Sequence, residues 1–331
     1  MKVSELGEFG LIDLLARMIA DAPNNQPAHQ KLLIGIGDDT AAWQGDISTQ
    51  LATVDSLIEG IHFSLDTISW KELGWKSLAV NLSDIAAMGG VPGYALVSLA
   101  LPENTDVDNV TALYEGMIEL AQQSQVAIVG GDTCRSPAVS ITVSVFGHSQ
   151  NNRILRRSTA APGDAIAVTG YLGSAAAGLE MLTNKLQLSP DVAGYLREAF
   201  LLPRPRLAEG QLLVKQGVVA AIDISDGLLS DLRHICRASQ MSARVDVDRL
   251  PIHPMVRDNF GGKERELALA GGEDYELLFT GSAEVINRVQ AEAPCLVTII
   301  GEITDGEPGR ISLFDANGKP VMIRETGWEH F

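Results

Sequence analysis

Apolar side chains in the N-terminal half of the chain follow two different spacings. Residues 4–20 carry them at helical intervals, which predicts an amphipathic helix, and residues 70–90 and 107–123 also predict helices. The other apolar residues come in shorter runs of strand type, within the segments KLLIGIGDDTAAW, LATVDSLIEGIHF, VPGYALVSLALP, VAIVGGDTCRS and AVSITVSVFGH. This half is therefore predicted to be a strand-rich α+β domain with two helices on one face of its sheet.

The C-terminal half begins after a polar segment and alternates strands with helices. The segment SQNNRILRRSTAAPGD contains Pro162 and Gly163, so we place a domain boundary there, with domains 1–150 and 151–331. Strand–turn–helix patterns predict a mixed α/β domain, ELALAGGEDYELLFTG is predicted to be a turn and then a strand, and the Asn-Gly pair in RISLFDANGKPVMI predicts a terminal hairpin. A length of 331 residues also favours two domains over one core.

Charge and cysteine usage narrow the possible functions. The chain has 25 Lys and Arg against 42 Asp and Glu, a formal net charge of −17, which repels nucleic acid and anionic membranes. The same field repels a nucleotide unless cations lie between the two. Three scattered cysteines without a CxxC pair argue against a disulfide framework or a structural zinc site. With no signal-peptide pattern and no apolar run of membrane-spanning length, we expect a cytoplasmic protein.

Aspartates recur where an apolar element meets a turn. They are Asp38, Asp39, Asp55, Asp84, Asp132, Asp223 and Asp226. Two such carboxylates about 4 Å apart repel each other by roughly 4 kcal/mol at an effective dielectric near 20. No His or Cys cluster of metal-binding spacing accompanies them, so oxygen ligands for magnesium or calcium are favoured over a zinc site. Magnesium also bridges carboxylates to a polyphosphate, which would let an acidic protein bind a nucleotide.

Structural explanations remain open for each of these positions. Aspartate beside glycine is common turn chemistry, and Asp223 or Asp226 could cap the helix that follows. The chain has no GxxxxGK[ST] motif, and the glycines of VTGYLGSAAAGL have the wrong spacing for a dinucleotide fingerprint, so a tight strand-to-helix turn explains them as well. VGGDT, at residues 129–133, is different because paired glycines expose backbone N–H groups beside an acid, which suits phosphate and metal bound together.

Taken in order, seven motifs resemble those of the thiamine-monophosphate kinase family. They are GIGDDTA, TVDSLIEGIHF, KSLAVNLSDIAAMGG, GGDT, RRSTAAPGD, DISDGL and GGEDYEL. The family belongs to a superfamily with aminoimidazole ribonucleotide synthetase and selenophosphate synthetase. The resemblance implies an N-terminal α+β domain that completes a β-barrel across a homodimer and a C-terminal α/β domain, with ATP bound between them. It implies the transfer of a phosphoryl group from ATP to thiamine monophosphate, which gives thiamine diphosphate.

The resemblance also implies roles for individual residues. The positions that match magnesium ligands are Asp38, Asp55, Asp84, Asp132, Asp223 and Asp226, with Thr53 at a position that helps to hold metal or nucleotide. ATP contacts match Gly131, Asp132, Arg157 and Ser225, and substrate contacts match His62, Glu273 and Trp328. Asp223, Asp226 and Arg157 are the expected catalytic residues, while Asp39 receives no role. Two departures stand out: Thr159 replaces the family's glycine, and Arg156 is a second candidate for the phosphate contact.

The expected chemistry needs charge neutralisation more than a strong base. The acceptor is a phosphate monoester that is largely ionised near neutral pH, so magnesium ions and an arginine would act by bringing two anions together in line, without a phosphoenzyme. A structural role remains the alternative for His62, Glu273 and Trp328. Among other functions, selenophosphate synthetase would require a reactive Cys near the N-terminus, and the first cysteine is Cys134. A non-catalytic protein that binds divalent ions would leave VGGDT and Arg157 unexplained.

Overall fold

The computed structural model describes residues 1–23, 27–34, 36, 41–45 and 47–322. It consists of two compact units. The N-terminal unit comprises Met1–Ile85 and Val91–Asn152, and the C-terminal unit comprises Ala86–Gly90 and Arg153–Phe331. The short segment 86–90 joins the second unit because Leu155 donates a backbone hydrogen bond to Met88 and the Gln211 side chain donates one to the carbonyl of Gly90.

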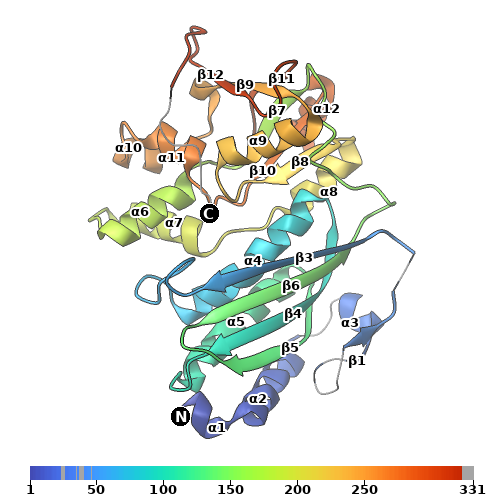
Figure 1. Cartoon of the computed structure of the whole chain (residues 1–331), viewed down its shortest axis with the longest axis vertical. Coiled ribbons are helices and arrows are strands. Elements are labelled where there is room, and N and C mark those ends of the chain that lie inside the picture. The colour runs from blue at the N-terminus through green and yellow to red at the C-terminus, as the bar shows by residue number, and fades with distance from the viewer. Residues whose placement is uncertain (24–26, 35, 37–40, 46, 323–331) are drawn as a thin grey trace. The chain divides into compact units, whose positions relative to one another are not determined.

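The N-terminal unit is built on a four-stranded sheet in the order β3-β6-β4-β5 (Figure 1). Its strands are β3 Gln50–Ile58, β4 Val91–Leu101, β5 Ala127–Arg135 and β6 Ser140–His148. Only β4 and β5 run parallel; the other neighbours are antiparallel. The helices are α1 Val3–Leu6, α2 Glu8–Asp21, α3 Pro27–Lys31, α4 Trp70–Ala87 and α5 Val107–Gln123, and a separate pair of strands is formed by β1 Leu32–Ile34 and β2 Ala42–Trp43.

The two faces of this sheet differ in their surroundings. Leu51 and Leu57 of β3 are buried, whereas Ala52, Val54 and Ser56, which alternate with the residues of the buried face, are exposed. Val54 leaves 59% of its surface open. Helices α4 and α5 lie behind the sheet in Figure 1. The described residues form no closed barrel, so the N-terminal unit is an open sheet covered by helices on one face.

The first strands of the chain cover one end of the other sheet face. Trp43 of β2 stacks on Tyr94 of β4, with ring centroids 4.5 Å apart, and contacts Phe146 at 5.8 Å. The Tyr94 hydroxyl donates a hydrogen bond to the carbonyl of Ala28 at 3.0 Å. These contacts form a small core cluster of their own around Tyr94, Ala127 and Val129.

The C-terminal unit is built on a six-stranded sheet in the order β12-β9-β11-β7-β10-β8. All neighbouring strands are antiparallel except β12 and β9. The strands are β7 Ala165–Thr169, β8 Ala220–Asp223, β9 Ser242–Asp246, β10 Leu277–Gly281, β11 Val297–Thr304 and β12 Ile311–Phe314. The helices are α6 Ser174–Asn184, α7 Pro190–Leu201, α8 Leu207–Gln216, α9 Leu228–Ser239, α10 Pro254–Asn259, α11 Glu264–Ala270 and α12 Ala283–Glu292, with the short 3-10 helix η1 Val247–Arg249.

Helices cover both faces of this second sheet, so the unit has three layers. Ile166 and Val168 of β7 belong to a core cluster with residues of α6, α7, α9 and α11. Ala167, which points to the opposite face, belongs to a cluster with residues of α8 and α12. Asp223, the last residue of β8, pairs with Leu277, the first residue of β10. The loop after β8 and the loop before β10 therefore lie side by side at one end of the sheet.

The predicted two-domain α/β organisation with mixed sheets is observed, and several local predictions need correction. The helix predicted over 4–20 is two helices that meet at Gly7, whose φ of 75° favours glycine. The ELALA segment forms α11 rather than a turn. β12 pairs with β9, and the return strand of the predicted terminal hairpin is reduced to a single bridge between Phe314 and Pro320.

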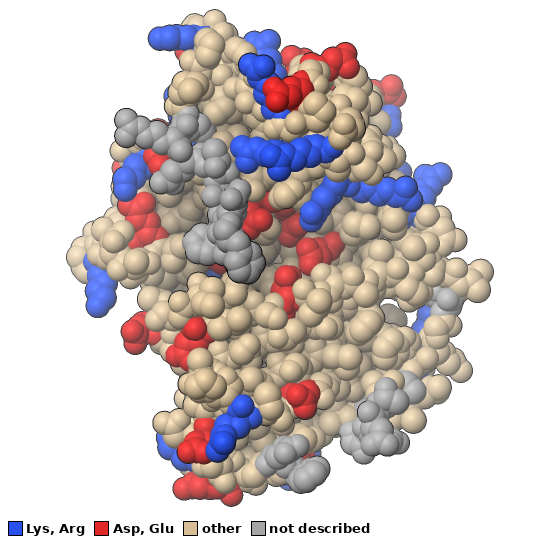
Figure 2. Space-filling view, in the orientation of Figure 1, with Lys and Arg blue, Asp and Glu red and all other residues tan. Residues whose placement is uncertain are grey.

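The distribution of charge and the character of the helices complete the description. Figure 2 shows Asp and Glu side chains on both units of the visible face, as the net charge of −17 leads one to expect. Within the described part of the chain, none of the helices combines the length and the apolar character needed to span a membrane.

Candidate active site

The loop after β8 contains the two C-terminal acids that the sequence singled out. Asp223 ends the strand and is only 4% exposed, and α9 begins after Gly227, which has a φ of 112°. No side chain caps this helix from the N-cap position, so Asp226 does not serve as its cap. Instead the carboxylate of Asp231, in the first turn of α9, accepts hydrogen bonds from the backbone N–H groups of Ser225, Asp226 and Gly227 at 3.1–3.2 Å. Asp226 is thereby left for another role.

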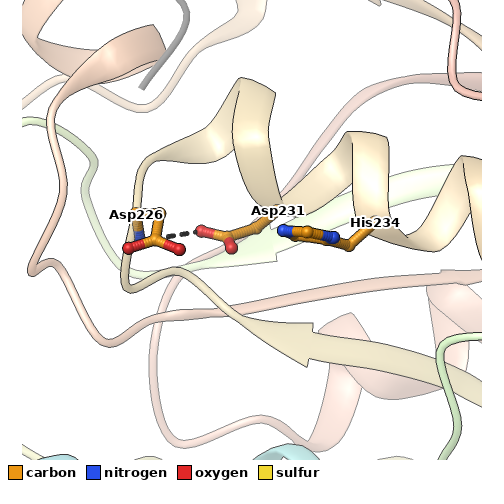
Figure 3. A group of neighbouring side chains, drawn as sticks. All are labelled: Asp226, Asp231 and His234. Atoms are coloured by element: carbon orange, nitrogen blue, oxygen red, sulfur yellow. Dashed lines mark hydrogen bonds between the residues drawn. The ribbon is translucent and has the colours of Figure 1, made fainter. Parts of the chain in front are cut away.

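Asp226, Asp231 and His234 form a compact group of possible metal donors (Figure 3). One ligand atom from each lies within 4.8 Å of the others. Burial, together with the nearby charges of Asp223 and Asp226, raises the pKa of Asp231 to about 8. Burial and the charge of Arg157 lower the pKa of His234, which favours the neutral imidazole that can bind a metal. A bound divalent cation would remove the repulsion among these acids.

Asp231 was not identified as a site residue from the sequence. Its support of the turn that carries Asp226 leads to a first prediction. We expect Asp231→Ala to raise the magnesium concentration needed for half-maximal activity about tenfold, because loss of a supporting group for metal ligands typically costs 10–100-fold. Asp231→Asn keeps an oxygen acceptor for the three N–H groups and should retain more of the activity. Magnesium titrations of both variants check this, and equal, wild-type magnesium dependence would show that the loop holds its shape without Asp231.

The GGEDYEL motif lies directly against this acid loop. The N–H of Glu273 donates to the carbonyl of Ser225 at 2.8 Å, the N–H of Tyr275 donates to the carbonyl of Ile224 at 2.9 Å, and the N–H of Ile224 donates to the carbonyl of Glu276 at 2.8 Å. The structure therefore joins the candidate substrate residue Glu273 to the turn that carries Ser225 and Asp226.

The conformation of the GGEDYEL loop is unusual and is tightly packed. Glu273 and Tyr275 both have positive φ, 67° and 49°, a region that non-glycine residues adopt at a cost. A side chain at Gly272 would place Cβ 2.5 Å from the carbonyl oxygen of Ser225, so only glycine fits there. Strained backbone that the surrounding contacts hold in place is typical of ligand sites.

Asp274, in the same loop, holds the beginning of α6. Its two carboxylate oxygens accept hydrogen bonds from the N–H groups of Gly173 at 2.7 Å and Ala175 at 3.2 Å. Burial raises the pKa of Asp274 from its ordinary 3.8 to about 8, although these hydrogen bonds act in the opposite direction. The charged form is thus disfavoured in the folded protein.

This shift predicts a pH dependence of stability. A folded-state pKa above the unfolded value means that the contribution of Asp274 is fully present below about pH 4 and is lost as pH rises through about 8. We expect the free energy of unfolding of wild type, relative to Asp274→Asn, to fall across this window. Urea unfolding of both proteins from pH 4 to pH 8.5 measures it. A difference that stays constant with pH would contradict the prediction.

In the N-terminal unit the structure brings together three of the predicted residues. Thr53 and Asp55 lie on the same face of β3, and the Thr53 hydroxyl donates a short hydrogen bond to the carboxylate of Asp84 on α4. Burial, together with the adjacent Asp84 carboxylate and its hydrogen bond, raises the pKa of Asp55 to about 6. Two acids that share a site in this way suit a bound cation.

Asp132 lies apart from that group, on the other edge strand. It belongs to β5, is exposed, and pairs with Ser98 of β4. The expectation that Asp132 lies where a strand meets a turn is wrong, because β5 continues through Arg135. Gly131 is required for a different reason: a Cβ there would lie 1.8 Å from the carbonyl oxygen of Val97.

The other predicted residues have mixed surroundings. Arg157 is exposed, and its carbonyl accepts a hydrogen bond from the Ser239 hydroxyl at 2.9 Å. His62 follows β3, and its Nδ1 accepts the N–H of Ile58 at 3.1 Å, a local backbone contact. Asp38, Asp39 and Trp328 lie outside the described residues.

Comparison with known proteins places both units in one class. Residues 37–149 match the family model described as AIR synthase related protein, N-terminal domain, and residues 161–313 match the corresponding C-terminal domain. The chain thus has the two-domain fold of AIR synthase related proteins.

Individual relatives define the family more narrowly. A thiamine-monophosphate kinase from Salmonella typhimurium is 42% identical over 90% of this chain and 91% of its own length. The crystal structure of thiamine-monophosphate kinase from Stenotrophomonas maltophilia is 36% identical, with a TM-score of 0.80 over 94% of this chain and 96% of that one. A structure described as AaThiL complexed with AMPPCP and TMP is 34% identical, with a TM-score of 0.77 over 100% and 99% of the two chains. The chain belongs to the thiamine-monophosphate kinase family and is therefore a kinase.

Proposed function

We propose that this protein phosphorylates thiamine monophosphate with ATP to give thiamine diphosphate. The observation that carries the proposal is the backbone pairing of the GGEDYEL loop with the acid loop, which puts Glu273 next to Ser225 and Asp226. A substrate residue and residues for nucleotide and metal must lie close together in a phosphotransferase. The relative described as complexed with AMPPCP and TMP, which this chain matches over its whole length, supports the same pair of substrates.

The side chains fit magnesium as the bound metal. Asp226 and Asp231 in one unit, and Asp55 and Asp84 in the other, are carboxylates held close together, and most donors are oxygen atoms. The proposed ligands are Asp38, Thr53, Asp55, Asp84, Asp132, Asp223 and Asp226. Magnesium would supply positive charge between the ATP phosphates and the acceptor phosphate, a task that −17 formal charges make necessary.

The remaining proposed roles concern positioning. Gly131, Asp132, Ser225 and Arg157 would contact ATP. Arg157 is preferred over Arg156 because its charge acts on His234, beside Asp226. His62, Glu273 and Trp328 would contact thiamine monophosphate, with Glu273 accepting from the amino group of the pyrimidine and Trp328 stacking on a ring.

Transfer would occur directly, in line, between the two substrates. The acceptor phosphate is already ionised near neutral pH, so the protein does not have to supply a strong general base. Asp223, Asp226 and Arg157 would act by holding the reacting groups in line and by offsetting their charge.

A homodimer with a shared barrel is part of the same proposal. The face of the N-terminal sheet opposite α4 and α5 exposes Ala52 and Val54, and these apolar side chains would be covered by the matching face of a second copy. Sedimentation equilibrium, with Val54→Lys as the test variant, should show a dimer for wild type and a weakened dimer for the variant.

The expected cytoplasmic location stays a prediction.

A coupled assay of ADP release tests the proposed substrates. With ATP and magnesium present, we expect turnover with thiamine monophosphate and much slower turnover with thiamine or with aminoimidazole precursors. Removal of magnesium with a chelator should abolish turnover. Phosphorylation of free thiamine alone would overturn the proposal, as would metal-dependent stabilisation without any ATP turnover.

A further inference from the structure

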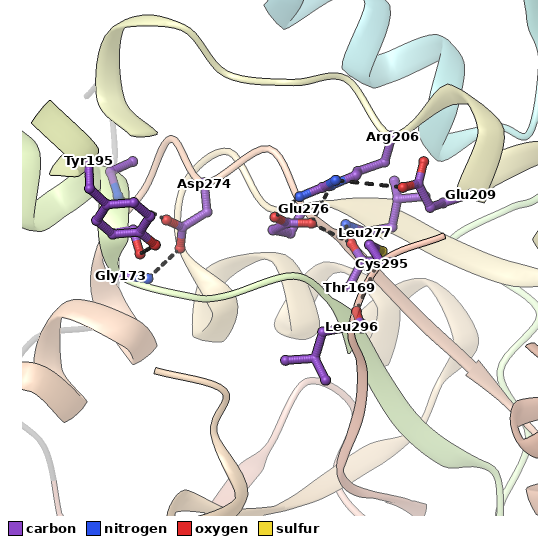
Figure 4. Close-up of polar contacts among 12 residues, drawn as sticks. Thr169, Gly173, Tyr195, Arg206, Glu209, Asp274, Glu276, Leu277, Cys295 and Leu296 are labelled. Carbon is purple, nitrogen blue, oxygen red and sulfur yellow. Dashed lines mark hydrogen bonds and ion pairs between the residues drawn. The ribbon is translucent and has the colours of Figure 1, made fainter. Parts of the chain in front are cut away.

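A buried ion pair joins two segments next to the candidate site. Arg206, just before α8, donates from Nε to one carboxylate oxygen of Glu276 at 2.7 Å and from Nη2 to the other at 2.5 Å (Figure 4). The two side chains are only 22% and 8% exposed. The Thr169 hydroxyl donates a further hydrogen bond to the Glu276 carboxylate at 2.6 Å. A second carboxylate lies near the arginine, with Oε1 of Glu209 3.5 Å from Nη1 of Arg206. Nothing in the proposed reaction uses these groups directly.

Net stability alone gives a weak reason for such a pair. Taking two charges out of water costs about as much as their attraction returns, and in some proteins a buried ion pair serves to fix geometry instead. A bidentate arginine–carboxylate contact is especially restrictive because the planar guanidinium accepts only one orientation of its partner. The position of the Glu276 side chain is therefore strongly defined.

Glu276 is where the GGEDYEL loop meets the sheet. Its carbonyl accepts the N–H of Ile224, and the N–H of the next residue, Leu277, donates to the Thr169 hydroxyl at 2.8 Å. At Gly170 a Cβ would lie 1.9 Å from the Glu276 carboxylate, so the backbone of the β7 end is also shaped around this side chain. Two hydrogen bonds thus hold one end of the loop, the chain at Gly170 leaves room for the Glu276 side chain, and Glu273 lies only three residues away.

Besides the backbone hydrogen bonds that join them, the two loops of the site each have a side-chain support of their own. The turn that carries Ser225 and Asp226 is held by the carboxylate of Asp231. The loop that carries Glu273 is held by Arg206 through Glu276. A change at Arg206 should therefore act on the loop of Glu273 more than on the turn of Asp226.

We propose that Arg206 is a positioning residue for the acceptor substrate: through Glu276 it holds the Gly271–Glu276 loop in its positive-φ conformation, with Glu273 placed to bind the thiamine part. The inference rests on the proposed function and deepens it. According to this inference, Arg206 affects the affinity for thiamine monophosphate. The affinity for ATP depends instead on the turn that Asp231 supports.

The test compares Arg206 with Arg204, two residues away. Arg204 also forms an ion pair with a glutamate, Glu198. This pair lies at the surface, since the two side chains are 72% and 51% exposed, and among the described residues Glu198 belongs to neither loop of the site. The variants are Arg206→Ala, Arg206→Lys, Arg204→Ala and Arg204→Lys. Kinetics give KM for each substrate and kcat, calorimetry gives the binding of thiamine monophosphate without ATP, and thermal unfolding reports the fold.

We expect Arg206→Ala to raise KM and the dissociation constant for thiamine monophosphate about tenfold, the cost of one lost hydrogen bond to a charged group, with KM for ATP changed less than about twofold. Arg206→Lys keeps the positive charge but loses the bidentate contact with the Glu276 carboxylate, so its effect on both constants should be intermediate. The Arg204 variants should behave as wild type. If Arg206→Ala does not fold, Arg206→Lys decides the question.

Three results would overturn the inference. They are a folded Arg206→Lys with wild-type affinity for thiamine monophosphate, equal increases in KM for both substrates, and loss of folding in both Arg206 variants, which a purely structural role would explain. Failure of the proposed function is distinguishable, because wild type itself would then show no turnover with thiamine monophosphate.

Discussion

We expect Asp226→Asn to lower kcat about 100-fold or more while the protein stays folded. Asp226 is not the N-cap residue of α9, a position that Gly227 occupies, and the N–H groups of the preceding turn are bound by Asp231. Its carboxylate is therefore spared for a ligand, and loss of a metal ligand should cost at least as much as the 10–100-fold that loss of a supporting group costs. Steady-state assays at saturating substrate, together with circular dichroism, measure the effect.

A matched control separates this effect from a general loss of acidity. Asp191 is an exposed aspartate in the first turn of α7, in the same unit, and Asp191→Asn should leave kcat unchanged. If Asp226→Asn retained near wild-type kcat, Asp226 would be a turn residue and the metal site would have to lie elsewhere.

We expect Gly131→Ala, which adds a single methyl group to β5, to lower the free energy of unfolding strongly. The added Cβ would lie 1.8 Å from the carbonyl oxygen of Val97 on the neighbouring strand, where no flexible side chain can move aside. The parallel strands β4 and β5 would have to separate, at a cost of about 3 kcal/mol, the upper end of the usual range for overpacking. Urea unfolding gives the change, and ATP binding should weaken as the proposed nucleotide contact moves.

The adjacent glycine supplies the control. At Gly130 an added Cβ would meet only the Cδ2 atom of Leu96, at 3.1 Å, and that side chain can turn away. Gly130→Ala should therefore be destabilised much less than Gly131→Ala. Equal losses for both variants would contradict the argument, because they would point to a general intolerance of side chains in β5.

The sequence predicted those features that depend on neighbouring residues. The run VVAAI followed by two aspartates gives a strand that ends in acids, and β8 indeed ends at Asp223. The same local logic left Asp226 with two explanations, since a cap and a ligand look alike in sequence. The structure removes the capping explanation, because the N-cap position of α9 is occupied by Gly227. The support of the turn by Asp231 had a usable signal in the sequence, since acids favour the first turn of a helix.

Contacts between distant residues could not be predicted in this way. Arg206 and Glu276 are separated by 70 positions, and nothing in LPRPR indicates a buried partner. Gly131 was interpreted as a source of free N–H groups, whereas its close approach to Val97 depends on the register of β5 with β4. Register is set by the whole sheet, and one sequence without homologues does not determine it.

The central claim is direct transfer of a phosphoryl group from ATP to thiamine monophosphate. The most direct test uses ATP made chiral at the γ-phosphorus with oxygen isotopes and sulfur, followed by analysis of the β-phosphorus of the thiamine diphosphate formed. In-line transfer between the bound substrates predicts thiamine diphosphate with inverted configuration. Retention of configuration would show a phosphoenzyme, and absence of thiamine diphosphate would show another acceptor; either result would contradict the account.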